Sequence, residues 1–174
     1  MKDLIYNDWD METHWRKKAL RSISKTVIMS VSRVLFVLYI ILLAYFLFFS
    51  ERYGRTIISD EYRYNLVLFK EVRRFILYRK ELGLESFIVN IFGNVLAFAP
   101  FGFVLPIISR SNRKLINIAL LSLEFSLTVE LIQLIFKVGI FDVDDLFMNT
   151  LGGILGGICF IICHKFIKAI KKLR

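Results

Sequence analysis

Apolar side chains occupy nearly every position in four stretches of the chain, at residues 34–49, 87–109, 115–136 and 146–163. Three stretches carry no charge, and the third contains two glutamates. A helix needs about 17–25 residues to cross a bilayer, and backbone groups in lipid must be satisfied within helices or closed barrels. Because the apolar positions are continuous rather than alternating, we predict four membrane-spanning helices, the first beginning near residue 27.

The composition supports a membrane protein and excludes several other classes. Hydrophobic residues make up 56% of the 174 residues, compared with about 45–50% in soluble domains. The 17 phenylalanines argue against disorder, and two cysteines are too few for a disulfide scaffold. The net charge of +9 is explained by residues flanking the apolar stretches. We therefore expect membrane lipids, and no nucleic acid, as partners.

Lysine and arginine residues predict the orientation of the chain. Residues 1–33 contain seven of them, residues 110–114 three and residues 165–174 five, and these segments alternate with the apolar stretches. On the opposite side, residues 50–85 contain eight basic and six acidic residues, and residues 137–145 contain one lysine and three aspartates. Since basic loops favour the cytoplasm, both termini are predicted to be cytoplasmic.

These patterns predict an all-α fold, an integral membrane four-helix bundle. A basic cytoplasmic segment is expected at residues 1–32, the transmembrane domain at 33–165 and a basic cytoplasmic tail at 166–174. Two overlapping G-x-x-x-G patterns in the fourth span, at Gly152 and Gly153, favour close helix packing.

Polar residues recur every three or four positions in each of the last three spans, which places them on one face of each helix. At 1.5 Å per residue, the three faces reach roughly 6–10 Å below the outer ends of their helices. We therefore predict one polar pocket that opens to the outside. The residues assigned to it are Asn90, Asn94, Glu130, Gln133, Asp142, Asp144, Asp145 and Asn149.

Structural roles are the alternative for several of these residues. Amides in membrane helices form interhelical hydrogen bonds, and aspartates at a helix start are stabilised by the helix dipole. For Glu130 a functional role is favoured, because placing an acidic residue inside a membrane span costs free energy and such residues usually have a function. Glu124 lies off the polar face. No metal-ligand spacing or catalytic motif is present, so we assign no metal, cofactor or catalytic residue.

The predicted outer segment contains an amphipathic pattern between residues 68 and 76, with apolar residues at helical spacing and cations around them. Such a helix either lies on the outer membrane face or packs on the mouth of the bundle, and it roofs the pocket in both cases. Cations here suit pyrophosphate or lipid headgroups. The residues assigned to headgroup binding are Arg63, Asn65, Lys70 and Arg73.

Four motifs together resemble those of VanZ-like membrane proteins, over about residues 33–165. The segment that starts at Asn90 is similar to N-x-x-x-N-x-x-x-F-x-P-x-G, and Glu130 begins E-x-x-Q. Asp142 begins D-x-D-D-x-x-x-N-T-x-G-G. The segment from Arg63 is similar to R-x-N-L-x-P-F-K, with Leu68 where the family usually has proline.

The resemblance implies a bacterial cytoplasmic membrane protein whose founding relative is linked to teicoplanin-type glycopeptide resistance. It does not supply a reaction. Three hypotheses follow. The favoured one is a binding or modulating protein that engages a lipid-linked cell-wall precursor or a lipoglycopeptide at the outer leaflet.

The other two hypotheses are a membrane-embedded enzyme and a small ion-coupled transporter. In the enzyme, Glu130 and Asp145 act as an acid/base pair, or the neighbouring aspartates hold a hard cation. In the transporter, Glu130 and Glu124 form a relay. No catalytic signature supports the first of these, and the lack of an internal repeat argues against the second.

Overall fold

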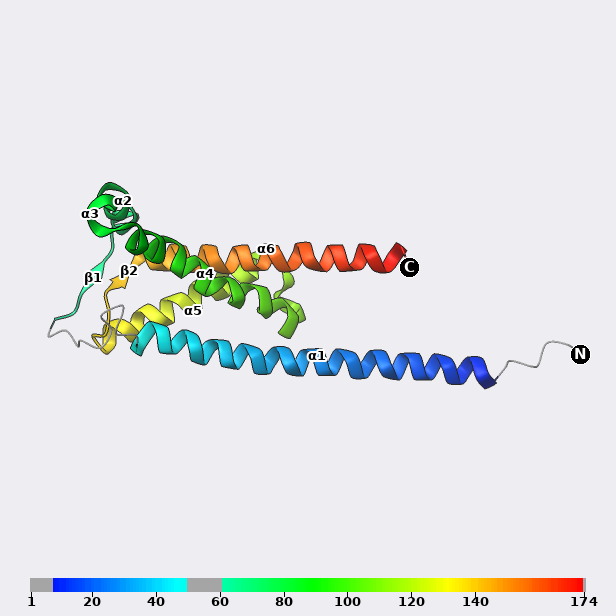
Figure 1. The fold of residues 1–174 in the computed structure, drawn as a ribbon. Helices are drawn as coiled ribbons and strands as arrows, with labels where there is room; N and C mark the ends of the chain where they lie inside the picture. Colours follow the sequence, from blue (N-terminus) through cyan, green and yellow to red (C-terminus); the bar gives the residue numbers. More distant parts are fainter. Residues whose placement is uncertain (1–7, 50–60, 174) are drawn as a thin grey trace, which may run out of the picture.

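The computed structural model describes residues 8–49 and 61–173, most of which are helical (Figure 1). The elements are, in order, α1 (Asp8–Phe49), β1 (Tyr64–Asn65), α2 (Lys70–Leu77), α3 (Arg79–Leu82), α4 (Leu84–Ile108), the 3-10 helix η2 (Arg110–Arg113), α5 (Leu115–Ile135), β2 (Phe141–Asp142) and α6 (Val143–Leu173).

Three of the helices contain apolar stretches long enough to cross a membrane, which confirms a helical membrane protein. The stretches are Thr26–Phe49 in α1, the whole of α5, and Val143–Lys172 in α6. Helix α4 has 25 residues, but its apolar stretch among the described residues, Phe92–Ile108, is shorter. A membrane crossing by α4, and hence the count of four, stays a prediction.

Helix α1 is longer than the apolar stretch that it contains. It is one helix of 42 residues and begins at Asp8. In Figure 1 it extends past the other helices, and its beginning lies on the same side as the end of α6. Among its described side chains, Leu43 is the one that is fully buried, so α1 lies at the edge of the bundle.

Glycines bring α6 close to its two neighbours. A Cβ on Gly152 or Gly156 would overlap the backbone of α4. A Cβ on Gly153 would overlap Ser122 of α5, and one on Gly157 would lie 2.8 Å from Ile118 Cδ1. Consecutive glycines thus face different helices, which explains why two G-x-x-x-G patterns overlap and why α6 packs against both α4 and α5.

Both short strands, with α2 and α3, lie at one end of the bundle (Figure 1), which we call the β end. The strands pair in parallel, with Tyr64 opposite Phe141 and Asn65 opposite Asp142. The sequence pattern did not predict this pair, because two-residue strands have no periodicity. Helix α2 covers most of the segment expected to be amphipathic, residues 68–76, and it buries Phe75.

Candidate functional site

Polar side chains from β1, β2, α4, α5 and α6 form hydrogen bonds with one another at the β end. Burial is unusually complete for such groups: Glu130 and Asp144 each retain 2% of their accessible surface, and Asn65 and Asp142 retain 6% and 7%. A buried polar group is costly unless it has hydrogen-bond partners, and a buried charge is more costly still. The contacts described below supply those partners.

Asp142 joins three elements at the start of α6. Its Oδ1 atom accepts hydrogen bonds from the backbone N–H of Asp144 (2.8 Å) and from Nδ2 of Asn65 (3.0 Å). The first bond caps α6, as aspartate before a helix commonly does. Burial raises the pKa of the Asp142 carboxyl, although these two hydrogen bonds partly offset the effect.

Glu130 binds the same strand from the opposite side. Its Oε2 atom accepts the backbone N–H of Asp142 at 3.0 Å. This bond joins α5 to β2, and it gives the carboxylate a partner deep inside the protein. Glu124, in contrast, is exposed, so the two glutamates lie on different faces of α5. That arrangement does not favour a direct relay between them.

Asp144 caps a helix that is distant in sequence. Its Oδ2 atom accepts the backbone N–H of Glu71 at 2.9 Å and of Val72 at 3.2 Å, and its Oδ1 atom accepts that of Phe69. Helix α2 has no side-chain cap of its own. The carboxylate of Asp144 therefore satisfies the amide groups at the positive end of α2, where an anion is most favourable.

Phe69 occupies an unusual backbone conformation next to this cap. Its φ is 62°, in the left-handed region that few non-glycine residues adopt. Its ring contacts that of Phe147 in α6 edge to face, with 5.2 Å between centroids. The hydrogen bond to Asp144 and this ring contact hold the turn that positions α2.

Two further pairs connect α6 to its neighbours. Asn94 Nδ2 donates to Asp145 Oδ1 at 2.5 Å, which joins α4 to α6, and both residues are half-buried. Deeper in the bundle, Asn149 Nδ2 donates to Ser126 Oγ at 2.9 Å. The Oδ1 atom of Asn149 and the Oγ atom of Ser122 are buried without hydrogen-bond partners among the described residues.

One predicted pocket residue binds elsewhere, and the side chain of another is not among those described. Gln133 is buried on α5, but its Nε2 atom donates to the backbone oxygen of Leu47 at 2.9 Å. Leu47 belongs to the last turn of α1, where backbone oxygens have no partner within the helix. Gln133 therefore binds the end of α1. Asn90 belongs to α4, but its side chain lies outside the described residues.

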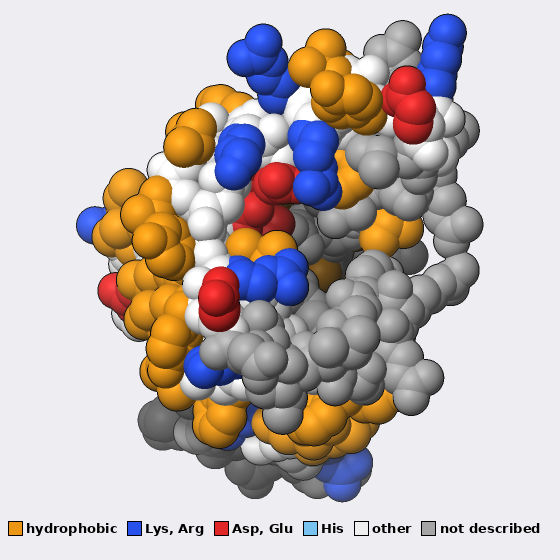
Figure 2. Space-filling model, turned by 90° about the vertical axis from the view of Figure 1, so that its left-hand side faces the viewer, with side chains coloured by type: hydrophobic (Ala, Val, Ile, Leu, Met, Phe, Trp, Pro, Cys, Tyr) orange, Lys and Arg blue, Asp and Glu red, His pale blue; other side chains and the backbone are white. Residues whose placement is uncertain are grey.

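The residues assigned to headgroup binding divide into two groups. Asn65 is buried against Asp142, so its role is internal. Arg63, Lys70 and Arg73 are exposed. On the surface at the β end, Figure 2 shows Lys and Arg side chains around a recess where acidic side chains are visible.

Among the described residues, no group of three or more His, Cys, Asp or Glu side chains is arranged to hold a metal ion. The aspartates instead bind backbone N–H groups and amides. In this arrangement the carboxylates bind backbone N–H groups at the β end. They thereby fix the position of α2, the helix that contains the cations.

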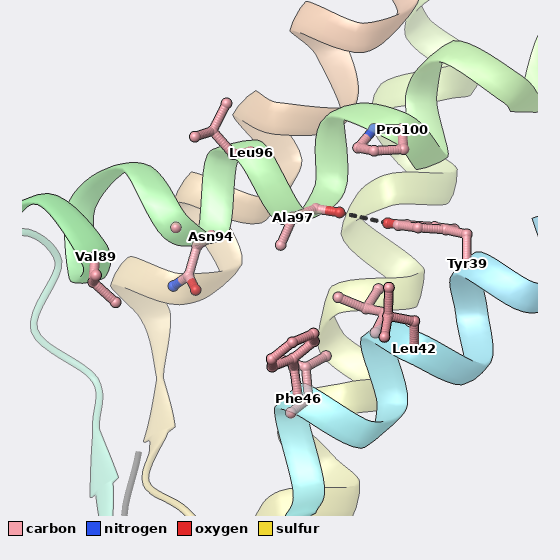
Figure 3. A pocket seen from close by; sticks show the side chains of 11 residues that line it. Tyr39, Leu42, Phe46, Val89, Asn94, Leu96, Ala97 and Pro100 are labelled. Carbon is pink, nitrogen blue, oxygen red and sulfur yellow. Dashed lines mark hydrogen bonds between the residues drawn. The ribbon is translucent and has the colours of Figure 1, made fainter. Parts of the chain in front are cut away.

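A cavity of about 420 Å³ lies between α1 and α4 (Figure 3). It runs from Val89 to Pro100 along α4, and Tyr39 lies at its far end, where the hydroxyl donates to the backbone oxygen of Ala97 at 2.5 Å. The sequence reasoning missed this cavity and Tyr39. The available signal was a polar hydroxyl in the middle of the first apolar stretch.

Comparison with known proteins identifies relatives of this chain. A family profile described as VanZ/LLP1 matches residues 36–164. Protein VanZ of Enterococcus faecium is 43% identical over 63 residues, which are 36% of this chain and 38% of that protein. The matched segment thus spans about two fifths of the relative. No solved structure matches the chain.

Proposed function

Because this chain belongs to the VanZ/LLP1 family, we propose that it binds phosphate-bearing lipids or lipid-tailed glycopeptides at the outer face of the bacterial cytoplasmic membrane. It acts as a binding protein rather than an enzyme, and its presence lowers the susceptibility of the cell to glycopeptides. The link to resistance comes from the family resemblance. The location follows from the basic segments at the chain ends and between α4 and α5, which favour the cytoplasm.

One observation carries the binding proposal: α2 presents exposed cations, and its first turn is hydrogen-bonded to Asp144 of α6. Asp144 fixes the first turn of α2, which contains Lys70, and Arg73 lies one turn further along. Arg63 precedes the strand that pairs with β2 and is also exposed. Because the backbone that carries these cations is already ordered, less conformational entropy is lost when they bind a phosphate. Arg74 is less available, because it is paired with Glu71 at 2.7 Å.

The arrangement of the carboxylates favours binding over catalysis. Glu130 and Asp144 are both buried and both accept backbone N–H groups. A general acid or base must reach the proton that it transfers. Hydrogen bonds from carboxylates to backbone N–H groups instead position the segments that bear the cations of α2.

The test is a susceptibility assay in a bacterial host that lacks family members. The host expresses the wild-type chain, a Lys70→Ala/Arg73→Ala variant or a Lys168→Ala/Lys171→Ala control, whose two lysines are exposed near the end of α6. The wild type and the control should raise the inhibitory concentration of a lipid-tailed glycopeptide. The α2 variant should return it toward the level of the empty vector, at equal membrane abundance.

Two outcomes would contradict the proposal. A wild-type chain that leaves susceptibility to lipid-tailed and tail-free glycopeptides unchanged removes the link to resistance. Full protection by the α2 variant at normal abundance shows that the cations of α2 are dispensable. Equal protection against both antibiotic classes indicates action on the cell-wall precursor rather than on the antibiotic tail.

A further inference from the structure

We propose that the cavity between α1 and α4 holds the hydrocarbon chain of a lipid whose phosphate headgroup lies at the β end. This inference rests on the proposed function, and it names the part of the ligand that enters the membrane. The cavity volume, about 420 Å³, falls within the 300–1,000 Å³ typical of ligand pockets.

The cavity is a defined gap, because α1 is held to the bundle on both sides of it. Toward the β end, Gln133 of α5 binds the backbone oxygen of Leu47. Toward the other end, Tyr39 binds the backbone oxygen of Ala97, and the rings of Phe36 and Phe101 have centroids 5.8 Å apart. Between these contacts the two helices leave space.

The lining suits a hydrocarbon chain. Most of the residues around the cavity are apolar, and several are open to the surroundings, including Leu42 (56% exposed) and Leu96 (68% exposed). Gly93 contributes no side chain, and a Cβ there would meet Val89 Cγ1 at an ordinary 3.8 Å. The absence of a side chain at Gly93 thus helps to keep the space open.

The dimensions fit one leaflet. From Val89 to Pro100 the cavity follows α4 for about 17 Å, and from Tyr39 to Leu47 it follows α1 for about 12 Å, at 1.5 Å per residue. One leaflet of a 30 Å hydrocarbon core is about 15 Å deep. Tyr39 closes the inner end, so the cavity accommodates part of one chain.

Hydrogen bonds link the lining of the cavity to α2, the helix that carries the cations. Asn94 lines the cavity and donates to Asp145. The neighbouring Asp144 binds the first turn of α2, which contains Lys70. In the proposed site, a chain in the cavity extends toward the β end, where α2 presents its exposed cations to the phosphate.

The headgroup, rather than the chain, must provide the selectivity. Bulk lipid tails are as apolar as the lining, so a chain gains little by leaving the bilayer for the cavity. Charge-assisted hydrogen bonds from Lys70 and Arg73 to a phosphate supply the preference. We therefore expect an anionic phosphate-headed lipid to occupy the cavity in preference to a zwitterionic lipid with the same chains.

Photo-crosslinking in phosphatidylcholine vesicles tests this inference. The purified full chain is reconstituted with a trace of phosphatidic acid, or of phosphatidylcholine, each carrying the same diazirine-labelled acyl chain. Labelled peptides are then mapped by mass spectrometry. We expect several-fold more labelling of the cavity residues of α1 and α4 with phosphatidic acid, and loss of that preference in Lys70→Ala/Arg73→Ala.

Cavity-filling variants provide the second arm. Gly93→Phe should reduce cavity labelling several-fold, and so should Leu42→Trp, which fills the space from α1 if the first variant folds poorly. Leu155→Phe adds volume to an exposed position of α6 outside the cavity and should leave labelling unchanged. Equal labelling by both lipids, or labelling that survives filling, would overturn the inference and indicate ordinary bilayer lipid.

The two proposals fail in distinguishable ways. Selective cavity labelling without any change in antibiotic susceptibility overturns the proposed function and leaves the lipid site in place. Protection from the antibiotic together with equal labelling of the cavity by both lipids overturns the lipid site and leaves the proposed function in place.

Discussion

The carboxylate of Asp144, at the start of α6, accepts the backbone N–H of Glu71, in the first turn of α2, at 2.9 Å. An isolated helix of eight residues is marginal in water, because nucleation is costly. The negative charge of Asp144 supplies the cap that α2 lacks locally. The surface that presents Lys70 and Arg73 therefore depends on a residue more than 70 positions away.

The same substitution at two neighbouring aspartates should have different consequences for stability. Asp144 uses both carboxylate oxygens to accept N–H groups, so Asp144→Asn directs an amide NH₂ toward a backbone N–H. Loss of hydrogen bonds to a charged group costs roughly 1.5–3 kcal/mol, and we expect a lower Tm in detergent. Asp142 accepts both of its bonds through Oδ1, so Asp142→Asn retains them and should keep the wild-type Tm or exceed it.

That comparison also has an outcome that would contradict it. Equal loss of Tm in the two variants would mean that charge, rather than the pattern of acceptors, stabilises the β end. Protease accessibility within residues 70–77 provides a local readout, since only Asp144→Asn should expose α2.

The stability contributed by Asp142 should depend on pH. Burial raises its pKa above the ordinary 3.8, so the folded chain retains this proton to higher pH than the unfolded chain does. The contribution is therefore fully present below about pH 3.8 and is lost as the pH rises through the raised pKa. Asp142→Asn does not titrate at this position. The Tm of the wild type minus that of the variant should fall across this range, and a difference that rises with pH would contradict the assignment.

Glu130→Gln separates charge from hydrogen bonding. Glutamine retains an oxygen that accepts the backbone N–H of Asp142, so membrane abundance and Tm should change little. If the charge is needed for function, resistance falls nonetheless. Glu130→Leu is the matched variant that also leaves the buried N–H without its partner, at a cost of about 1–3 kcal/mol. Full resistance with Glu130→Gln at normal abundance would assign a purely structural role.

Adjacent glycines of α6 should differ in their tolerance of a side chain. A Cβ at Gly156 would overlap the backbone of Ala99 and lie 2.9 Å from the backbone nitrogen of Phe103. One at Gly157 meets the flexible end of Ile118. Since backbone yields less than a side-chain terminus, Gly156→Ala should lower the Tm more than Gly157→Ala, with overpacking costs of about 1–3 kcal/mol. Equal Tm values would indicate that α4 and α6 are not in such close contact.

Cysteine labelling in intact cells tests the orientation. The exposed native thiols Cys159 and Cys163 are first replaced by alanine. Glu61→Cys, at the β end, should then react with an impermeant maleimide from outside. Ser111→Cys, between α4 and α5, should react only after permeabilisation. The reverse pattern would place the β end and the cations of α2 in the cytoplasm.

The amino-acid pattern is enough to predict the helical membrane class and most of the polar residues at the β end. Long apolar runs have few stable alternatives in lipid, because every backbone group must be satisfied. Spacing of three or four residues also places polar groups on one helix face without further information. For this reason Glu130 and the three aspartates at the start of α6 could be selected before their contacts were known.

The partner that each of these residues contacts depends on how distant segments pack, and the pattern does not predict it. Helical spacing shows which residues share a face of a helix, but it does not show which helix that face contacts. For this reason Gln133 was assigned to the pocket, although its side chain binds the end of α1. Asn65 was grouped with the exposed cations. The pairing of β1 with β2 buries it against Asp142, and strands of two residues are too short to show a periodic pattern. The cavity beside Tyr39 depends on how far α1 stands from α4. That separation is set by packing between distant segments, which no local pattern encodes.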